Sequence, residues 1–375
     1  MMKKLAAVLL LMWLALSCAS AETADIAIDL PGLQACFALP QDWACLTRDT
    51  SMSVYNQLGM SQREIEPYME ENDIYALIFD METGVELQLV IYEWPAADCD
   101  TLADEDMAFL RDMIREDMTH AGYDVLDCRI YEGAHRFVRT NAVWTDPDGL
   151  TEPMIVYSTD QLGYVVELYA FPWEGEVDEA LIAQADAVAD SLRLTLPEGC
   201  AAICMDGITV RFQLPDGMAL LTSEQAVEAC ELPRDYEALR RSGFMQGELQ
   251  GLIVGPDAAW EICWSLLEGE SGDLDLLTDE AAARHAKDTG IRYMEDGRAV
   301  ENSETRWLGE HRYTHITYST VDARDGSLTC ADEYYTRQNG WNVVVCLYSY
   351  GEAAPAEIMA ALEEMIRTTC ITTIE

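Results

Sequence analysis

Two stretches, FALPQDWACLT at Phe37–Thr47 and FQLPDGMALLT at Phe212–Thr222, decide how this sequence is organised. Both begin with Phe-x-Leu-Pro, carry a large apolar residue at the seventh position, and end in Leu-Thr. Each is typical of a strand that enters a proline-containing turn and is followed by a second strand. The recurrence of one strand–turn–strand pattern indicates an internal repeat.

The repeat continues beyond these stretches, in the same order and at nearly the same spacing. The offset between the two stretches pairs Glu86 with Glu261 without a gap. After single-residue adjustments, Gly133-Ala-His135-Arg136 matches Gly309-Glu-His311-Arg312, and Tyr157-x-Thr159-x-Gln161 matches Tyr334-x-Thr336-x-Gln338. We therefore predict two homologous domains, residues 22–197 and 198–375, separated at Leu196-Pro-Glu-Gly199.

Each copy alternates strand patterns with helical ones. Helices are predicted over residues 52–70, 102–121 and 177–192, and again over 223–241, 278–289 and 356–368. Hairpin turns are predicted at Asp146-Pro-Asp-Gly149, Asp325-Gly326 and Asn339-Gly340. Hairpin-linked strands interspersed with helices predict the α+β class, with a mostly antiparallel sheet packed by helices in each domain.

The motif Phe-x-Leu-Pro-x-x-Trp, at Phe37–Trp43, and the layout around it resemble the PsbP-like fold, an α/β/α sandwich. The resemblance covers the chain once per copy, although the second copy has Met218 where the first has Trp43. It implies a non-enzymatic accessory, assembly or binding domain that is exported or membrane-associated. It carries over no functional residues.

The start of the chain is typical of a secretory signal peptide. Lys3 and Lys4 precede an apolar run over residues 5–16, and Ala19-Ser-Ala21 is a small-x-small cleavage pattern. We predict a signal peptide over residues 1–21 and an extracytoplasmic protein. The alternative is a lipoprotein anchored through Cys18, because Ala15-Leu-Ser-Cys18 resembles a lipobox. No later run reaches 18 apolar residues, so no transmembrane segment is expected after the leader.

The charge balance is strongly acidic, with 68 Asp and Glu residues against 23 Lys and Arg residues and a net charge of −45. Nucleic acid is excluded as a partner, because it is bound through neutralising Lys and Arg. Such a surface attracts cations, cationic peptides or a basic wall polymer. The simpler interpretation is that the acid excess keeps an exported protein soluble.

The chain contains twelve cysteines, which after export would meet an oxidising compartment. Cys36 and Cys45 flank the turn at Leu39–Asp42 and are predicted to form a disulfide across a hairpin. Cys200 is predicted to pair with Cys204, or one of the two with Cys370. A metal cluster would require closer and repeated ligand spacing.

Few residues point to catalysis. His311 and His315 have the spacing of a helical zinc pair, but the segment reads as a strand, where they lie about 13 Å apart. His135-Arg136 and His311-Arg312 occupy equivalent repeat positions, for which a structural role is the favoured interpretation. Residues 146–152 resemble a calcium loop but lack its later acids, so a turn is favoured. The aromatic residues of the late strands are predicted to fill the core: Tyr164, Tyr169, Trp341 and Tyr348.

The leading hypothesis is an exported, non-catalytic binding or accessory protein without a cofactor. Its partner would be a protein, peptide or wall component, with a cationic one favoured by the charge. One alternative is a secreted hydrolase with its site in one copy. The other is low-affinity cation binding by clusters such as Asp98-Cys-Asp100 and Asp104-Glu-Asp106.

Overall fold

The computed structural model describes residues 24–374, except 31, 41–42, 146–148, 223–239, 241, 270–271 and 322–325. The predicted leader with Cys18, the calcium-loop acids Asp146 and Asp148, and the predicted helix 223–241 apart from Arg240 therefore lie outside the described residues. The chain divides between Pro197 and Glu198 into two compact units, called unit 1 and unit 2.

Unit 1 contains two antiparallel sheets. A three-stranded sheet has the order β1-β2-β10, and a seven-stranded sheet has the order β3-β4-β5-β9-β8-β7-β6. The strands are β1 (Ala24–Asp29), β2 (Gln34–Leu39), β3 (Trp43–Thr47), β4 (Ile74–Asp80), β5 (Val85–Glu93), β6 (Asp124–Glu132), β7 (Arg136–Thr145), β8 (Thr151–Gln161), β9 (Tyr164–Pro172) and β10 (Arg193–Thr195). The helices are α2 (Met52–Gln57), α3 (Gln62–Glu71), the 3-10 turn η1 (Cys99–Thr101), α4 (Asp104–His120) and α5 (Glu179–Ser191).

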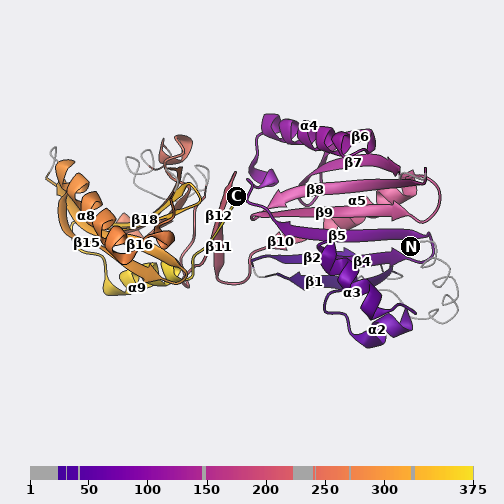
Figure 1. Cartoon of the computed structure of the whole chain (residues 1–375), viewed down its shortest axis with the longest axis horizontal. Helices are drawn as coiled ribbons and strands as arrows, with labels where there is room; N and C mark the ends of the chain where they lie inside the picture. Colours follow the sequence, from indigo (N-terminus) through magenta and orange to yellow (C-terminus); the bar gives the residue numbers. More distant parts are fainter. Residues whose placement is uncertain are drawn as a thin grey trace. The chain divides into compact units, whose positions relative to one another are not determined.

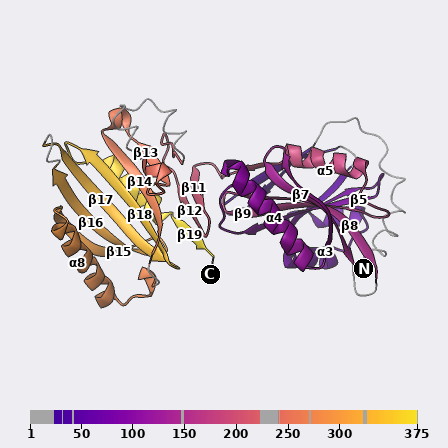
Figure 2. The same ribbon diagram turned by 90° about the horizontal axis from the view of Figure 1, so that it is seen from above.

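The large sheet of unit 1 lies between two different layers. On one face, the small sheet and α5 enclose the main core, in which Phe37, Leu87, Leu168 and Val188 are almost fully buried. On the other face, α2 and α3 cover β3 and β4, while α4 covers β6 and β7. Figure 2 shows α5 on the opposite side of the strands from α3 and α4.

Unit 2 repeats this order. Its small sheet is β11-β12-β19 and its large sheet is β13-β14-β18-β17-β16-β15. The strands are β11 (Cys200–Met205), β12 (Ile208–Gln213), β13 (Gly251–Val254), β14 (Trp260–Glu268), β15 (Ala299–Leu308), β16 (His311–Val321), β17 (Leu328–Gln338), β18 (Trp341–Tyr350) and β19 (Cys370–Thr373). The helices are η2 (Pro256–Ala258), η3 (Leu274–Leu276), α8 (Asp279–Glu295) and α9 (Ala356–Arg367). The α+β class, with helices packed on antiparallel sheets, is thus confirmed (Figure 1).

The predicted helix 52–70 is wrong as a single element. The chain forms α2, leaves the helix at Leu58, and begins α3 only at Gln62. Gly59 has a φ of 68°, a left-handed conformation that ends helices and that glycine adopts without a steric penalty. The predicted turn at Asn339-Gly340 is confirmed, because both residues have positive φ, 44° and 83°, between β17 and β18.

The predicted disulfide between Cys36 and Cys45 does not form. The turn between them leads from one sheet to another: Cys36 on β2 faces Ala27 of β1, whereas Cys45 on β3 faces Ile78 of β4. Both are free thiols, and burial raises the pKa of Cys45 to about 12. Cys200 and Cys204 lie four residues apart on β11, about 13 Å by the rise of a strand and outside the reach of a local disulfide.

Among the described residues, no helix is long and apolar enough to cross a membrane.

Candidate ligand-binding cleft in unit 1

Strand β5 has two chemically different faces. Val85, Leu87, Leu89 and Ile91 point into the main core, so the alternate residues, beginning with Glu86 and Gln88, project from the opposite face. Strand β9 behaves in the same way: Val166, Leu168 and Ala170 enter the core, while Glu167, Tyr169 and Phe171 project with Glu86. The outer face of these two central strands therefore carries carboxylates and aromatic rings.

Helices flank this outer face without closing over it. Helix α3 packs on β4, and α4 packs on β6 and β7, whereas β8, β9 and β5 lie between the two helices (Figure 1). A cleft of about 410 Å³ opens there, within the usual size range of small-molecule sites. Its lining residues come from both helical sides and from five strands: Tyr68, Asn72, Ile74, Gln88, Val90, Tyr123, Trp144, Glu152, Met154, Tyr169 and Phe171.

Aromatic rings dominate the walls of the cleft. The rings of Tyr169 and Phe171 lie parallel, with an interplanar angle of 3° and centroids 6.0 Å apart. Tyr68 stands at the rim, 43% exposed. Aromatic faces attract cations through their quadrupole, most strongly where water is partly excluded.

One carboxylate, Glu152, lines the cleft. A second, Glu86, is bonded to the lining residue Gln88, whose Nε2 donates to Glu86 Oε1 at 2.8 Å and to the Tyr68 hydroxyl at 3.2 Å. Burial raises the pKa of Glu86, and the negative charge of Glu152 raises it further. Within the described part of the chain, neither carboxylate forms an ion pair with Arg or Lys. The cleft thus has a local excess of negative charge.

A third carboxylate, Glu167, lies two residues before Tyr169 on the same face. It accepts from the Tyr169 hydroxyl at 2.8 Å and from Ser158 Oγ at 3.4 Å. Burial raises its pKa as well, because these two neutral donors only partly replace the lost hydration. A bound cation would favour the ionised form of all three acids.

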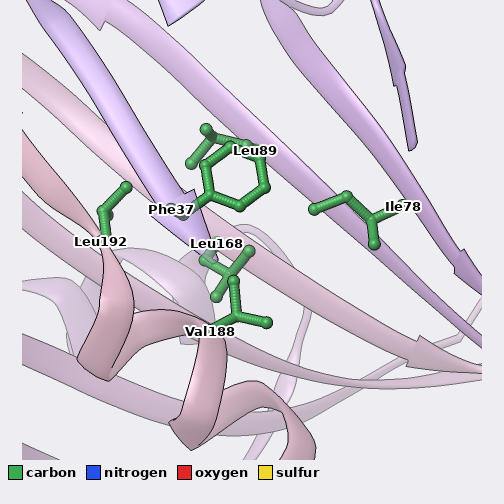
Figure 3. A pocket seen from close by; sticks show the side chains of 6 residues that line it. All are labelled: Phe37, Ile78, Leu89, Leu168, Val188 and Leu192. Carbon is green, nitrogen blue, oxygen red and sulfur yellow. The ribbon is translucent and has the colours of Figure 1, made fainter. Parts of the chain in front are cut away.

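A second cavity, on the core side of the sheet, is part of the packing. Six apolar side chains from β2, β4, β5, β9 and α5 meet there (Figure 3) and leave no room for a water molecule: Phe37, Ile78, Leu89, Leu168, Val188 and Leu192. It contains no polar group that could orient a ligand.

His135 and Arg136 lie away from the cleft and join the start of β7 to the turn before α4. The Asp100 carboxylate is hydrogen-bonded to His135 Nδ1 and to the Arg136 amide, each at 2.7 Å. The Arg136 guanidinium donates to the Leu102 carbonyl at 2.6 Å and to Asp104 at 2.8 Å. His135 Nε2 accepts from the Leu194 amide at 3.3 Å, so both ring nitrogens are engaged and neither is available to a substrate.

His311 and Arg312 make the same contacts in unit 2. The Asp275 carboxylate is hydrogen-bonded to His311 Nδ1 at 3.0 Å and to the Arg312 amide at 2.5 Å. The Arg312 guanidinium donates to the Leu277 carbonyl and to Asp279, each at 2.8 Å. We call this repeated arrangement the His–Arg clasp. It fixes the N-terminus of α4 or α8 against the neighbouring strand.

The other candidates from the sequence are engaged elsewhere. His311 and His315 lie on one strand, as predicted, and bond to different carboxylates; His315 Nε2 is 2.7 Å from Asp332. Asp98 accepts from the Leu162 amide at 2.6 Å, and Asp100 belongs to the clasp. The described residues contain no group of three or more His, Cys, Asp or Glu side chains placed to hold a metal.

The cleft was not predicted from the sequence, and Tyr169, predicted to fill the core, lines the cleft instead. The available signal was the alternation along the first part of β5, where Glu86 and Gln88 stand between apolar residues. That alternation identifies a polar sheet face but not the helices that wall it.

The comparisons with known proteins add little. No protein-family model and no curated protein matches the chain. The solution structure of cyanobacterial PsbP (CyanoP) from Synechocystis sp. PCC 6803 aligns with 48% of this chain and 96% of its own, at 12% identity and a TM-score of 0.30. A crystal structure of DynU16, from the dynemicin biosynthetic locus, aligns with 75% of this chain and 94% of its own, at 8% identity and a TM-score of 0.14. The first is a weak resemblance at the level of the fold.

Proposed function

We propose that this chain is an exported, non-catalytic binding protein, built from two PsbP-like domains, whose unit 1 cleft takes up a cationic group. The observation that carries the proposal is an aromatic-lined cleft with Glu152 in its lining and Glu86 bonded to the lining residue Gln88, neither acid having a basic partner among the described residues. Carboxylates without basic partners in a partly dry site favour the arrival of a positive charge.

The composition of the cleft supports binding rather than catalysis. Its described lining contains no His, Cys, Ser or Lys, the side chains that most often act as nucleophiles or proton carriers. Its rings and carboxylates instead suit the apolar and charged parts of an organic cation. The net charge of −45 would raise the rate at which such a ligand arrives.

Isothermal titration calorimetry on residues 22–375 tests the proposal. The probes are n-butylammonium and n-butylguanidinium, with neutral n-butylurea as the control for apolar contacts. Both cations should bind with one site, and the urea should not bind.

Site assignment requires matched variants. Glu86→Gln/Glu152→Gln removes two charges from the cleft, whereas Glu105→Gln/Asp106→Asn removes two exposed charges from the start of α4. Each lost charge-assisted contact costs about 1.5–3 kcal/mol, so the cleft variant should bind at least about tenfold more weakly. The control should bind like the wild type. Equal binding by both variants would refute the cleft as the site.

A further inference from the structure

We infer that the cation taken up by the unit 1 cleft is a quaternary ammonium, a trimethylammonium group surrounded by aromatic rings. This inference rests on the proposed function and narrows it to one ligand class. It comes from three properties of the lining: the number of its rings, the internal hydrogen bonds of its neutral polar side chains, and its single carboxylate.

Five aromatic side chains, which we call the aromatic cage, line the cleft. Trp144 projects from β7, Tyr169 and Phe171 from β9, Tyr68 from α3, and Tyr123 lies between α4 and β6. The four rings other than Tyr68 pack against one buried apolar cluster of the sheet. They remain half-buried, and Tyr68 is 43% exposed. Apolar surface gathered in this way is typical of a binding site.

The neutral polar side chains of the cleft already have partners within the unit. Asn72 Nδ2 donates to the Tyr68 carbonyl at 2.8 Å. Gln88 Nε2 is shared between Glu86 and the Tyr68 hydroxyl. The Tyr169 hydroxyl donates to a carboxylate two residues away on its own strand. A sugar, or another ligand recognised through many hydrogen bonds, would have to break these internal bonds.

The charge of the lining suits a cation that has no N–H group. Glu152 is the one carboxylate among the lining residues, and the strand register places it directly opposite Trp144. A primary ammonium or a guanidinium must replace its hydration with several acceptors around its N–H groups. A quaternary ammonium needs no acceptor. Aromatic rings attract it through their quadrupoles, and a nearby carboxylate balances its charge.

Trimethylammonium is carried by free solutes and by phosphatidylcholine headgroups. In the lipid, a phosphate lies close to the nitrogen and would approach Glu152. The net charge of −45 also opposes the approach of an anionic group. We therefore expect a solute whose trimethylammonium has no anion beside it.

Calorimetry on residues 22–375 with three probes of the same shape or the same hydroxyethyl chain tests the ligand class: choline, ethanolamine and 3,3-dimethylbutan-1-ol. The last is the neutral analogue of choline, with carbon in place of nitrogen. Choline should bind at one site, at least about tenfold more tightly than either of the other two.

The three affinities separate this inference from the proposed function. Equal affinity for choline and ethanolamine, or binding of n-butylammonium without binding of choline, would overturn the inference and leave the proposed function standing. Equal affinity for choline and its neutral analogue would overturn both, because charge would then play no part. Failure of every cation to bind would also overturn both.

Variants of the aromatic cage give a second readout. Trp144→Leu removes a ring and keeps an apolar side chain, so choline should bind at least about fivefold more weakly; Trp144→Phe keeps a ring and should lose less. Trp94→Leu is the matched control, because Trp94 is 46% exposed and lies outside the lining. Tyr68→Leu repeats the test at the exposed rim, where folding should not suffer. Wild-type choline affinity in both Trp144→Leu and Tyr68→Leu would overturn the inference.

Sedimentation with phosphatidylcholine vesicles distinguishes the two sources of the group. Choline binding without sedimentation supports the inference with a free solute as the ligand. Sedimentation that choline reverses supports the inference with the lipid headgroup as the source, and corrects the expectation of a solute. Sedimentation that choline does not reverse, together with no calorimetric binding of choline, would overturn the inference.

Discussion

The ion pair between Arg240 and Glu261 is the perturbation whose cost can be stated most directly. The Glu261 side chain is 0% exposed and that of Arg240 is 17% exposed, so Arg240→Ala would remove a two-pronged cationic partner from a buried carboxylate. Removing one partner of a buried pair costs about 3–5 kcal/mol. We expect about 3 kcal/mol, at the low end of that range, because Arg240 retains some contact with water. For a unit of this size, that corresponds to roughly 6–12 °C in melting temperature.

Urea unfolding followed by pulsed hydrogen exchange and mass spectrometry measures this cost within unit 2. Peptides from β14 report on that unit, and peptides from β5 report on unit 1 as an internal reference. Arg306→Ala is the matched control, because its pairs with Glu304 and Glu363 are 37–44% exposed and should contribute less than about 1 kcal/mol. Arg240→Ala/Glu261→Gln should recover more than half of the loss, since the buried negative charge is then removed together with its cationic partner. A cost equal to that of Arg306→Ala, or a double variant no more stable than the single one, would refute the reasoning.

Three further predictions concern single positions. Asn339→Leu should destabilise unit 2 by about 1–2 kcal/mol in urea unfolding, because leucine, unlike asparagine, rarely adopts positive φ and the 2.7 Å bond to Thr373 is lost; a change below about 0.5 kcal/mol would contradict this. Asp100→Asn should cost unit 1 about 1–2 kcal/mol at pH 7, less than a fully buried charged hydrogen bond because the carboxylate is 37% exposed. Burial opposes ionisation of Asp100, but hydrogen bonds from His135 and Arg136 outweigh it and lower its pKa, so the wild type should lose this advantage as the pH falls below about 4; a constant difference down to pH 2.5 would argue against it. Glu86→Gln should raise the free energy of unfolding at pH 7. The raised pKa of Glu86 means that the stability of the wild type falls as the pH rises above the pKa of an ordinary Glu, and that cation binding by the wild type weakens as the pH falls through the raised pKa. Parallel stability curves for variant and wild type from pH 4 to 8 would count against both effects.

The sequence predicted the features that depend on local chemistry. The α+β class followed from strand and helix periodicity, and the turn at Asn339-Gly340 from the preference of these residues for positive φ. The single helix over residues 52–70 was wrong because Gly59 adopts a left-handed conformation, which separates α2 from α3. The cross-hairpin cysteine pair was wrong because a short turn can pass from one sheet to another, as it does between β2 and β3.

The cleft could not be predicted because it depends on residues distant in the sequence. Tyr68 and Phe171 line one cleft only after β5 and β9 pair and α3 packs on β4. Glu86 is one of 68 acidic residues, and it becomes distinctive through its burial and its lack of a basic partner within the described structure. The repeat alignment did pair it with Glu261, but the different environments of the two acids required the coordinates.

The most direct test of cation binding in the cleft is the indole N–H resonance of Trp144, which lines it. In ¹H–¹⁵N spectra of residues 22–375, with the signal assigned through Trp144→Phe, n-butylguanidinium should shift this resonance saturably. The same titration should leave it unmoved in Glu86→Gln/Glu152→Gln, and n-butylurea should leave it unmoved in the wild type. An unmoved Trp144 signal at saturating n-butylguanidinium, or an equal shift by n-butylurea, would contradict a cation site in unit 1.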